Sequence, residues 1–316
     1  MLALSTSWIS QTLDDPQRLV NELNAVAVGG VELEYRLGRS LFENLKKPLR
    51  EAGIRVVGLH NYCPSPGVIP KAPPSGDYFR LSALDAEERK LAVQWTTRTI
   101  EQAHDVEAAY VVLHCGLVEM DTGAQTVREL ADAAGQDRQP LQRFLERKLA
   151  LLEQRKGPHL DALLFSLDPL VQAAEKYRIT LGIENRYHYN ELPGHTEFNR
   201  IFETFDGGPI GYWHDCGHAH AGEMLGLISQ QELLEARGNR LVGIHLHDAR
   251  GLDDHRAPGS GEIDFNLLMP YLTPDLPVVI ELAPGTRREE LEQAVTTART
   301  ICGADHISDA PDHEKI

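Results

Sequence analysis

The sequence predicts a single α/β domain built as a (β/α)8 barrel, and two patterns in its 316 residues support this. Eight short apolar runs recur along the chain, and helical patterns alternate with them. Strands that are nearly all apolar and alternate with helices are typical of a parallel sheet covered on both faces. Eight such units fit a closed barrel, which takes about 250 residues plus insertions. A doubly wound open sheet is the competing fold, but it would more naturally carry a glycine-rich phosphate turn after an early strand, and the sequence has none.

The predicted strands and helices alternate along the whole chain. The strands are predicted at 2–8, 30–35, 54–60, 109–114, 179–185, 210–215, 241–248 and 277–282. The first helix, 14–26, has an aspartate directly before Pro16, which is a signature of a helix start. Further helices are predicted at 82–103, 140–155, 167–178 and 287–301. We expect one barrel domain over residues 1–305 and a flexible tail over 306–316.

Two long segments follow the third and fourth predicted strands. The first, 63–79, contains five prolines and is expected to be a stiff irregular loop. The second, 116–139, leads into the additional helix 140–155. In a barrel both segments lie at the C-terminal ends of the strands, where active sites of this fold lie. We therefore expect these extended loops to form walls or a lid over a small pocket, although loops also tolerate insertions without a function.

The composition is typical of a soluble globular protein, with 42% hydrophobic and 25% charged residues. The formal net charge of −16 argues against nucleic acid as a partner, because proteins that bind phosphate backbones usually carry a basic face. A local basic patch or bound divalent cations could offset that charge. The sequence shows neither a membrane span nor a signal peptide. Four cysteines without the spacing of a disulfide framework favour a reducing, cytoplasmic location.

Six predicted strands place their first strongly polar residue at the C-terminal end. Side chains alternate between the two faces of a strand, so the phase of these residues can be compared. In the third strand, for example, Val56 and Gly58 precede His60 on the same face. The six strand-end residues are His60, His114, Glu184, Asp215, His245 and Glu281. We expect all six to point into the mouth of the barrel.

These six side chains predict a bound metal ion. Three carboxylates and three imidazoles in one place would repel one another or stay unsatisfied without a cation, because unpaired buried charges are costly. Histidine with Asp or Glu suits Zn²⁺, Mn²⁺, Fe²⁺ or Co²⁺, and oxygen-rich subsets suit Mg²⁺ or Mn²⁺. Taken singly, each residue has a structural alternative, such as a hydrogen-bonded histidine. Glu32 and Glu34 alternate with apolar residues, and Glu34, which lies nearer the mouth, is the candidate to support the ligands.

The segments GIEN, DCGH, HLHD, DDH, PGSGEIDF and VIEL resemble those of the xylose isomerase-like TIM-barrel superfamily, over nearly the whole chain. This group includes sugar isomerases, ketose epimerases, inosose dehydratases and endonuclease IV. Resemblance to the sugar enzymes implies one divalent metal ion held by Glu184, Asp215, His245 and Glu281. Resemblance to endonuclease IV would add a second ion, bridged by Glu184 and held by His60 and His114, and a third ion held by His218, Asp253 and His255. The resemblance thus implies a cofactor of one to three metal ions per chain.

The resemblance also implies isomerisation or epimerisation of a sugar or keto-sugar derivative through an enediolate, with dehydration as a close variant. Glu184 and Glu281 would be the catalytic acid and base. Further residues would contact the substrate: His218, His247 and His255 at hydroxyl groups, Arg250 at a carboxylate or phosphate, and Trp213 as an apolar wall unless it packs inside the barrel. The expected partners are a small carbohydrate and, as is common in the superfamily, further copies of the chain.

Other functions stay open from the sequence. Phosphoester hydrolysis by two or three metal ions fits the ligand set, but the acidic net charge opposes a nucleic-acid substrate. Iron-dependent oxidation is a further alternative, because Asp215 with two histidines resembles a facial triad. A non-catalytic binding barrel fits least, because the set of metal ligands is so complete.

Overall fold

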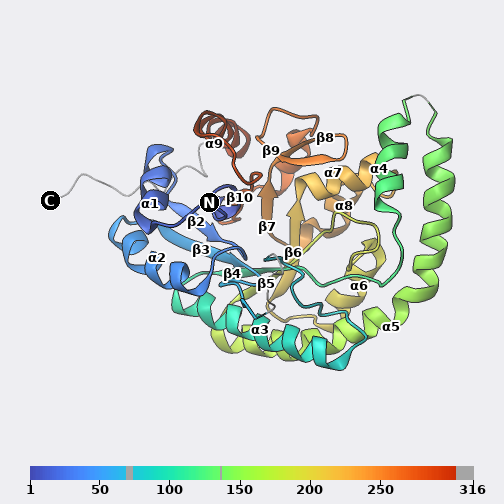
Figure 1. Cartoon of the computed structure of the whole chain (residues 1–316), viewed down its shortest axis with the longest axis horizontal. Coiled ribbons are helices and arrows are strands. Elements are labelled where there is room, and N and C mark those ends of the chain that lie inside the picture. The colour runs from blue at the N-terminus through green and yellow to red at the C-terminus, as the bar shows by residue number, and fades with distance from the viewer. Residues whose placement is uncertain (69–73, 136, 304–316) are drawn as a thin grey trace.

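The computed structural model describes residues 1–68, 74–135 and 137–303. Its centre is a closed barrel of eight parallel strands (Figure 1). In chain order the barrel strands are β1 (Leu2–Ser5), β2 (Gly30–Leu33), β3 (Arg55–His60), β4 (Tyr110–Leu113), β5 (Thr180–Glu184), β6 (Ile210–Asp215), β7 (Leu241–Leu246) and β10 (Val278–Ile280). β1 closes the barrel by pairing with both β2 and β10. The predicted (β/α)8 barrel is confirmed, and each of the eight predicted strands is present.

The interior of the barrel is filled by side chains, above all by Tyr110 and Trp213. Both are buried, and their ring centroids lie 4.5 Å apart. Two glycines make room for Trp213, because a Cβ atom on Gly182 or Gly243 would lie 2.8 Å or 2.0 Å from its ring. This packed interior forms the floor below the polar residues at the strand ends.

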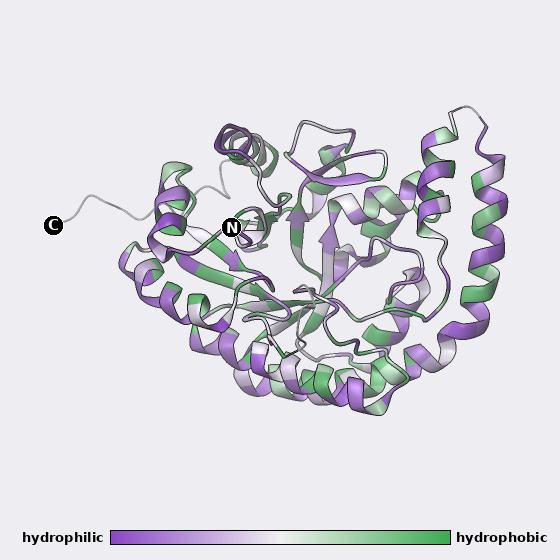
Figure 2. Cartoon of the chain, in the orientation of Figure 1, coloured by the Kyte–Doolittle hydropathy of each residue, from purple (hydrophilic) through white to green (hydrophobic). Residues whose placement is uncertain are grey.

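Helices surround the barrel and turn their hydrophobic residues towards it, while hydrophilic residues face outwards (Figure 2). They are α1 (Pro16–Ala25), α2 (Arg39–Glu51), α3 (Ala86–Asp105), α4 (Ala124–Ala133), α5 (Gln139–Tyr177), α6 (His195–Thr204), α7 (Cys216–Met224), α8 (Gln230–Arg237) and α9 (Arg288–Cys302). Short 3-10 turns lie at Thr6–Trp8, Gly238–Arg240 and Phe265–Tyr271. As predicted, an aspartate caps α1 before its proline: Asp15 accepts the N–H of Gln17. Among the described residues no helix has the length and apolar character that crossing a membrane requires.

α5 joins two helices that the sequence predicts as separate. It runs for 39 residues, with Pro158 and Pro169 inside it. At 1.5 Å per residue it is about 58 Å long. Each internal proline removes one backbone N–H donor from the helix, and Pro158 lies in the gap that the sequence predicts between the helices 140–155 and 167–178. Tertiary packing on both sides of the prolines keeps the helix continuous.

The two halves of α5 pack against different parts of the molecule. The second half buries a row of leucines in the core around the barrel, Leu163, Leu167 and Leu170. The first half buries Leu141 and Leu145 in a separate cluster together with residues of α4 and α7. Figure 1 shows α4 and the first half of α5 standing as a pair beside the barrel. The predicted wall after the fourth strand is therefore a helical one.

The sequence did not predict the two-stranded antiparallel sheet of β8 (Asp248–Arg250) and β9 (Asp253–Arg256), which follows β7. Its turn contains Gly251, whose φ of 56° is in the left-handed region that favours glycine. The short, highly charged strands lack the apolar alternation by which a hairpin is recognised in a sequence.

The four cysteines are buried and free. Of the predicted loop 63–79, residues 69–73 lie outside the described part of the chain. The same holds for the predicted flexible tail, 306–316.

Candidate metal centre

Four strand-end residues meet in one place and are here called the inner group: Glu184, Asp215, His245 and Glu281. All four are buried, and pairing of β6 with β7 sets Asp215 directly beside His245. His245 Nδ1 lies 2.7 Å from Glu184 Oε1 and 3.0 Å from Glu281 Oε2. Asp215 Oδ2 lies 3.7 Å from the same nitrogen. A single imidazole N–H cannot satisfy three carboxylates, whereas a divalent cation fits a donor set of three carboxylates and one imidazole.

The histidines balance the charge of the inner group in the protein itself. Burial alone would raise the pKa of Glu184, but hydrogen bonds from His114 and His245 outweigh burial and hold that pKa well below its usual value. Burial would also raise the pKa of Glu281, but the charge and hydrogen bond of His245 outweigh burial and lower that pKa. Burial disfavours the charged form of His245, but Glu281 and Glu32 outweigh it and raise the pKa of His245 well above its usual value. The carboxylates are therefore ionised at neutral pH, as metal ligands must be.

Glu32 supports His245 from the side opposite the inner group. Its Oε1 and Oε2 atoms lie 3.2 Å and 3.4 Å from His245 Nε2, and the side chain is fully buried. A carboxylate on the far nitrogen fixes the orientation of a ligating imidazole, here with Nδ1 towards the inner group. The sequence pointed to Glu34 for such support, but Glu34 bonds Ser10 and Arg36. The alternation of the strand had left both glutamates possible.

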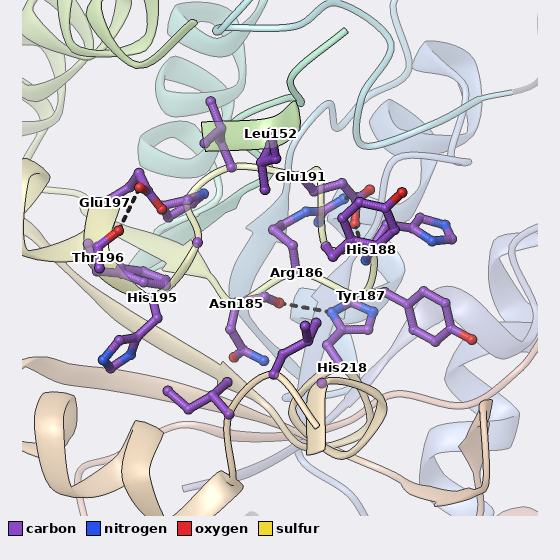
Figure 3. Close-up of a pocket in the computed structure, with 18 of the residues that line it drawn as sticks. Leu152, Asn185, Arg186, Tyr187, His188, Glu191, His195, Thr196, Glu197 and His218 are labelled. Carbon is purple, nitrogen blue, oxygen red and sulfur yellow. Dashed lines mark hydrogen bonds and ion pairs between the residues drawn. The ribbon is translucent and has the colours of Figure 1, made fainter. Parts of the chain in front are cut away.

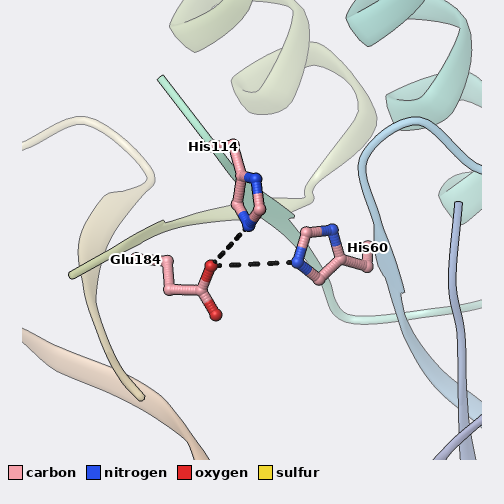
Figure 4. Close-up of side chains that lie close together, drawn as sticks. All are labelled: His60, His114 and Glu184. Atoms are coloured by element: carbon pink, nitrogen blue, oxygen red, sulfur yellow. Dashed lines mark ion pairs between the residues drawn. The ribbon is translucent and has the colours of Figure 1, made fainter. Parts of the chain in front are cut away.

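A second group, here called the bridge group, consists of His60, His114 and Glu184 (Figure 4). The Nε2 atoms of His114 and His60 lie 2.8 Å and 3.8 Å from Glu184 Oε2. Their Nδ1 atoms lie near other acceptors: His60 at 3.0 Å from Asn61 O, and His114 at 2.9 Å from Asp77 Oδ2. Both Nε2 atoms are thus free to act as ligands, because the Nδ1 atoms can carry the protons.

The buried guanidinium of Arg186 also contacts the bridge group. Its NH1 lies 3.2 Å from Glu184 Oε2, the oxygen that the two histidines face. Its NH2 lies 2.9 Å from Asp77 Oδ2 and 3.0 Å from Glu191 Oε1. A second metal ion here would share Glu184 Oε2 with a cation that the protein already provides. The bridge group therefore fits a metal less well than the inner group does.

The outer group consists of His218, Asp254 and His255. His255 Nδ1 lies 3.1 Å from Asp254 Oδ1, and His218 Nε2 lies 3.8 Å from Asp254 Oδ2. The structure does not bring the predicted ligand Asp253 into this group, because its side chain is 71% exposed and pairs with Arg256. The Asp-x-His assignment came from the resemblance to endonuclease IV. His255 has a φ of 56°, which breaks the alternation and brings Asp254 to the same side as His255.

Comparison with known proteins identifies the family. A family model described as a xylose isomerase-like TIM barrel matches residues 20–300. The chain belongs to this family. This xylose isomerase-like chain is also 26% identical over 188 residues to the uncharacterized protein MJ1311 of Methanocaldococcus jannaschii. That alignment covers 58% of the chain and 53% of MJ1311, so the chain spans about half the length of this relative.

Solved structures share the barrel at low sequence identity. A D-tagatose 3-epimerase-like protein is 19% identical, with 95% of each chain covered and a TM-score of 0.62. The 3-keto-D-glucoside 4-epimerase YcjR of E. coli is 14% identical, with 95% of this chain and 99% of that one covered and a TM-score of 0.65. The IolI protein with a bound zinc atom is 15% identical, with 95% and 97% covered and a TM-score of 0.65. These likenesses show a common fold.

In this xylose isomerase-like barrel three of the predicted substrate contacts lie elsewhere. Trp213 is fully buried inside the barrel and forms no apolar wall for a ligand. His247 is fully buried, with Nε2 3.0 Å from Asp215 Oδ2 and Nδ1 accepting the backbone N–H of His255. Arg250 is exposed on β8 and donates to the carbonyl of Ser260. Of the predicted substrate contacts, His218 and His255 remain, since both lie in the outer group.

Asp248 is a structural residue of the site that the sequence did not reveal. It is 1% exposed, and its carboxylate accepts four backbone N–H groups at 2.8–3.1 Å. The donors are Ala249, Gly259, Gly261 and Ile263. Asp248 thereby ties the segment PGSGEI back to β8 and fixes the hairpin that carries the outer group. The Asp of the segment HLHD was the available signal, but the sequence does not show which backbone groups its carboxylate binds.

Proposed function

We propose that the protein is a divalent-metal-dependent isomerase or epimerase that acts on a sugar or keto-sugar derivative. The observation that carries the proposal is the placement of Glu184 and Glu281. They come from β5 and from the residue after β10, yet both lie within 3.0 Å of His245 Nδ1. Two ionised carboxylates that approach one point from different parts of the barrel can exchange protons with opposite faces of a bound substrate. A bound divalent ion would supply the positive charge that stabilises negative charge developing on substrate oxygens.

The residues of the chain account for the proton transfers. One carboxylate, Glu184 or Glu281, removes the proton from the carbon next to the substrate carbonyl, and the other, once it has taken up a proton from solvent, delivers that proton on the opposite face. His114 and Arg186 hold Glu184 Oε2, so that Oε1 stays directed towards the centre. His218 and His255, at the partly exposed rim, bind and orient hydroxyl groups. The packed floor of Tyr110 and Trp213 closes the centre from below.

The comparisons support this substrate class. Proteins with the same fold include a D-tagatose 3-epimerase-like protein and a 3-keto-D-glucoside 4-epimerase. The zinc atom bound by the IolI protein, which has the same fold, supports a bound divalent metal ion.

The test is deuterium exchange from solvent into candidate keto-sugars, followed by NMR, with protein loaded with Mn²⁺, Co²⁺ or Zn²⁺. We expect exchange at the carbon next to the carbonyl, lost after treatment with a chelator and in Glu281→Gln. Asp253→Asn is the matched control, because that carboxylate is exposed and lies outside the centre. Absence of exchange across a broad set of ketoses, with metal bound, would contradict the proposal.

A second candidate function is phosphoester hydrolysis by several metal ions. It is favoured by one observation: the described residues contain three ligand groups, and the inner and bridge groups share Glu184. The contact of Arg186 with the shared carboxylate and the net charge of −16 weigh against it. Metal content by mass spectrometry separates the two functions. Two or three zinc ions per chain, with cleavage of bis-4-nitrophenyl phosphate, would favour hydrolysis, whereas one ion favours the isomerase or epimerase.

A further inference from the structure

A cavity of about 360 Å³ lies beside the candidate metal centre, bounded by α5, the loop after β5, α7 and the start of α8 (Figure 3). Asn185, Arg186 and His218 form part of its lining. Arg186 bonds Glu184, and the backbone N–H of His218 donates to Asp215 at 2.7 Å. One wall of the cavity is therefore the outer side of the metal centre. The volume lies within the range typical of small-molecule sites, about 300–1,000 Å³.

Much of the remaining lining is apolar. Figure 3 shows Leu152 of α5 on the side of the cavity opposite His218. The large apolar side chains in the lining include Leu149, Leu152, Leu192, Phe198, Leu227 and Ile228. Such a surface favours an apolar group, because transfer of apolar area from water is the main source of affinity in a preformed pocket.

The charged side chains of the lining are already paired. Lys156 Nζ lies 2.6 Å from Glu153 Oε1 and 2.7 Å from Glu197 Oε1. Arg186 bonds Glu191 in addition to Glu184. Glu153, Lys156, Arg186, Glu191 and Glu197 are the five such residues in the lining, and each has a partner of opposite charge. None of these five charged side chains is left without a partner for a phosphate or an ammonium group, so the pairing favours a neutral occupant.

We propose that this cavity binds a neutral, largely apolar substituent, an aryl or alkyl group, carried by a sugar whose reacting end lies at the metal centre. For its sugar part the inference rests on the proposed function. It narrows the substrate to glycosides or similar conjugates and away from sugar phosphates. The wall formed by Leu149 and Leu152 lies in the part of α5 that stands beside the barrel, so this part of the helix has a role in choosing the substrate.

The first experiment uses benzyl alcohol as the probe and the zinc-loaded full chain, with backbone NMR of the cavity residues. We expect shifts at Leu227 and Ile228, and weaker binding of benzyl phosphate and benzylamine. The blocking variant is Gly222→Leu, on the cavity face of α7, where a Cβ atom would meet only Ile228, at 3.8 Å and 3.9 Å. Leucine favours a helix more than glycine does, so this variant should fold, and it should weaken benzyl alcohol binding by about tenfold or more. Gly222→Ala, which leaves most of the space open, is the control and should bind nearly as the parent does.

Unchanged binding in Gly222→Leu, shifts confined to other parts of the protein, or tighter binding of benzyl phosphate would each overturn the inference. The second experiment compares turnover of phenyl and methyl conjugates of the same keto-sugar. A KM lower for the phenyl conjugate, by a factor that Gly222→Leu removes, would support the inference. Equal KM values with normal turnover would reject it and leave the proposed function intact. No turnover of either conjugate would count against the proposed function, while benzyl alcohol binding would still decide the role of the cavity.

Discussion

The inner and outer groups of the candidate metal centre are built in different ways. The inner group stands at the ends of paired barrel strands, and Asp215 and His245 are fully buried. The outer group comes from α7 and from the β8–β9 hairpin, and the side chains of Asp254 and His255 are 23% and 28% exposed. Side chains fixed by a packed sheet are preorganised, whereas side chains on a hairpin can adjust to what binds. We infer that the inner group performs the chemistry and that the outer group positions the substrate.

The sharpest test of this division removes the inner carboxylates. In Glu184→Gln or Glu281→Gln, we expect kcat to fall by about 10²–10⁴-fold, because proton transfer to and from substrate contributes that much. Metal content, measured by mass spectrometry after gel filtration, should fall in the same variants. The comparison would fail if substitution of His255 had an equally large effect on kcat.

The hairpin can be weakened without touching the inner group. Asp248→Ala leaves four backbone N–H groups, one buried and three partly buried, without their acceptor and should lower the free energy of unfolding by about 2–4 kcal/mol. Urea unfolding gives this value, and metal titration of the folded variant should show an intact inner group. If the variant lost inner-group metal as well, the two groups would be one structural unit.

The contact of Glu32 with His245 gives the next largest expected effect. Glu32→Gln should weaken metal binding at the inner group by about 10–100-fold, because it removes the charge that orients the ligating imidazole. Isothermal titration calorimetry with Zn²⁺ measures this directly. Glu34→Gln is the matched control, because Glu34 lies two residues further on, bonds Ser10 and Arg36, and its loss should leave the metal affinity nearly unchanged.

The structure of the outer group predicts that two adjacent aspartates have different effects on KM. Asp254→Asn should raise KM by about tenfold, because it removes a charged partner of His255 and His218. Asp253→Asn should have no measurable effect, since that side chain points to solvent. Steady-state kinetics on the substrate found by deuterium exchange compares the pair. If Asp253→Asn raised KM more than Asp254→Asn did, Asp253 and not Asp254 would belong to the outer group.

The smallest expected effect is a pH dependence of stability in the metal-free protein. Burial opposes protonation of His255, but its bond to Asp254 and the charge of Glu281 outweigh burial and raise its pKa to about 9. The histidine of an unfolded chain has a pKa of about 6.5, so this interaction stabilises the fold fully below that pH. The stabilisation is lost as the pH rises through 9. Chelator-treated protein should therefore unfold more easily at pH 9 than at pH 6.5, and His255→Gln should make that difference smaller.

The inner group could be found from the sequence because two regular patterns combine in it. Strand alternation and barrel closure together bring Glu184, Asp215, His245 and Glu281 to one end of the sheet, whatever the loops do. Sequence could not decide between Glu32 and Glu34, because the choice depends on the pairing of β2 with its neighbours. The position of Trp213 depends on two distant glycines that admit its ring to the barrel interior.

The outer group was harder to predict because its geometry is set by irregular backbone. The positive φ of His255 moves the ligand position from Asp253 to Asp254, and the neighbouring amino-acid types do not indicate this backbone conformation. Arg186, which limits the bridge group, lies two residues after Glu184, and the sequence does not show that its guanidinium bonds this carboxylate. The continuity of α5 across Pro158 and Pro169 depends on packing with partners far away in the chain.

The two-part construction of α5 separates the wall of the cavity from the part of the helix that covers the barrel. The half after Pro158 is anchored at 81–82, where His159 and Ser166 bond backbone carbonyls, and it must keep its register to cover the barrel. The half before it carries Leu149 and Leu152 into the cavity and packs on α4. Insertion or deletion of one whole turn there would move that wall by about 5.4 Å along the helix axis. Related barrels could therefore diversify in the length of the conjugates they accept by changing a helix that contributes no residue to the metal centre.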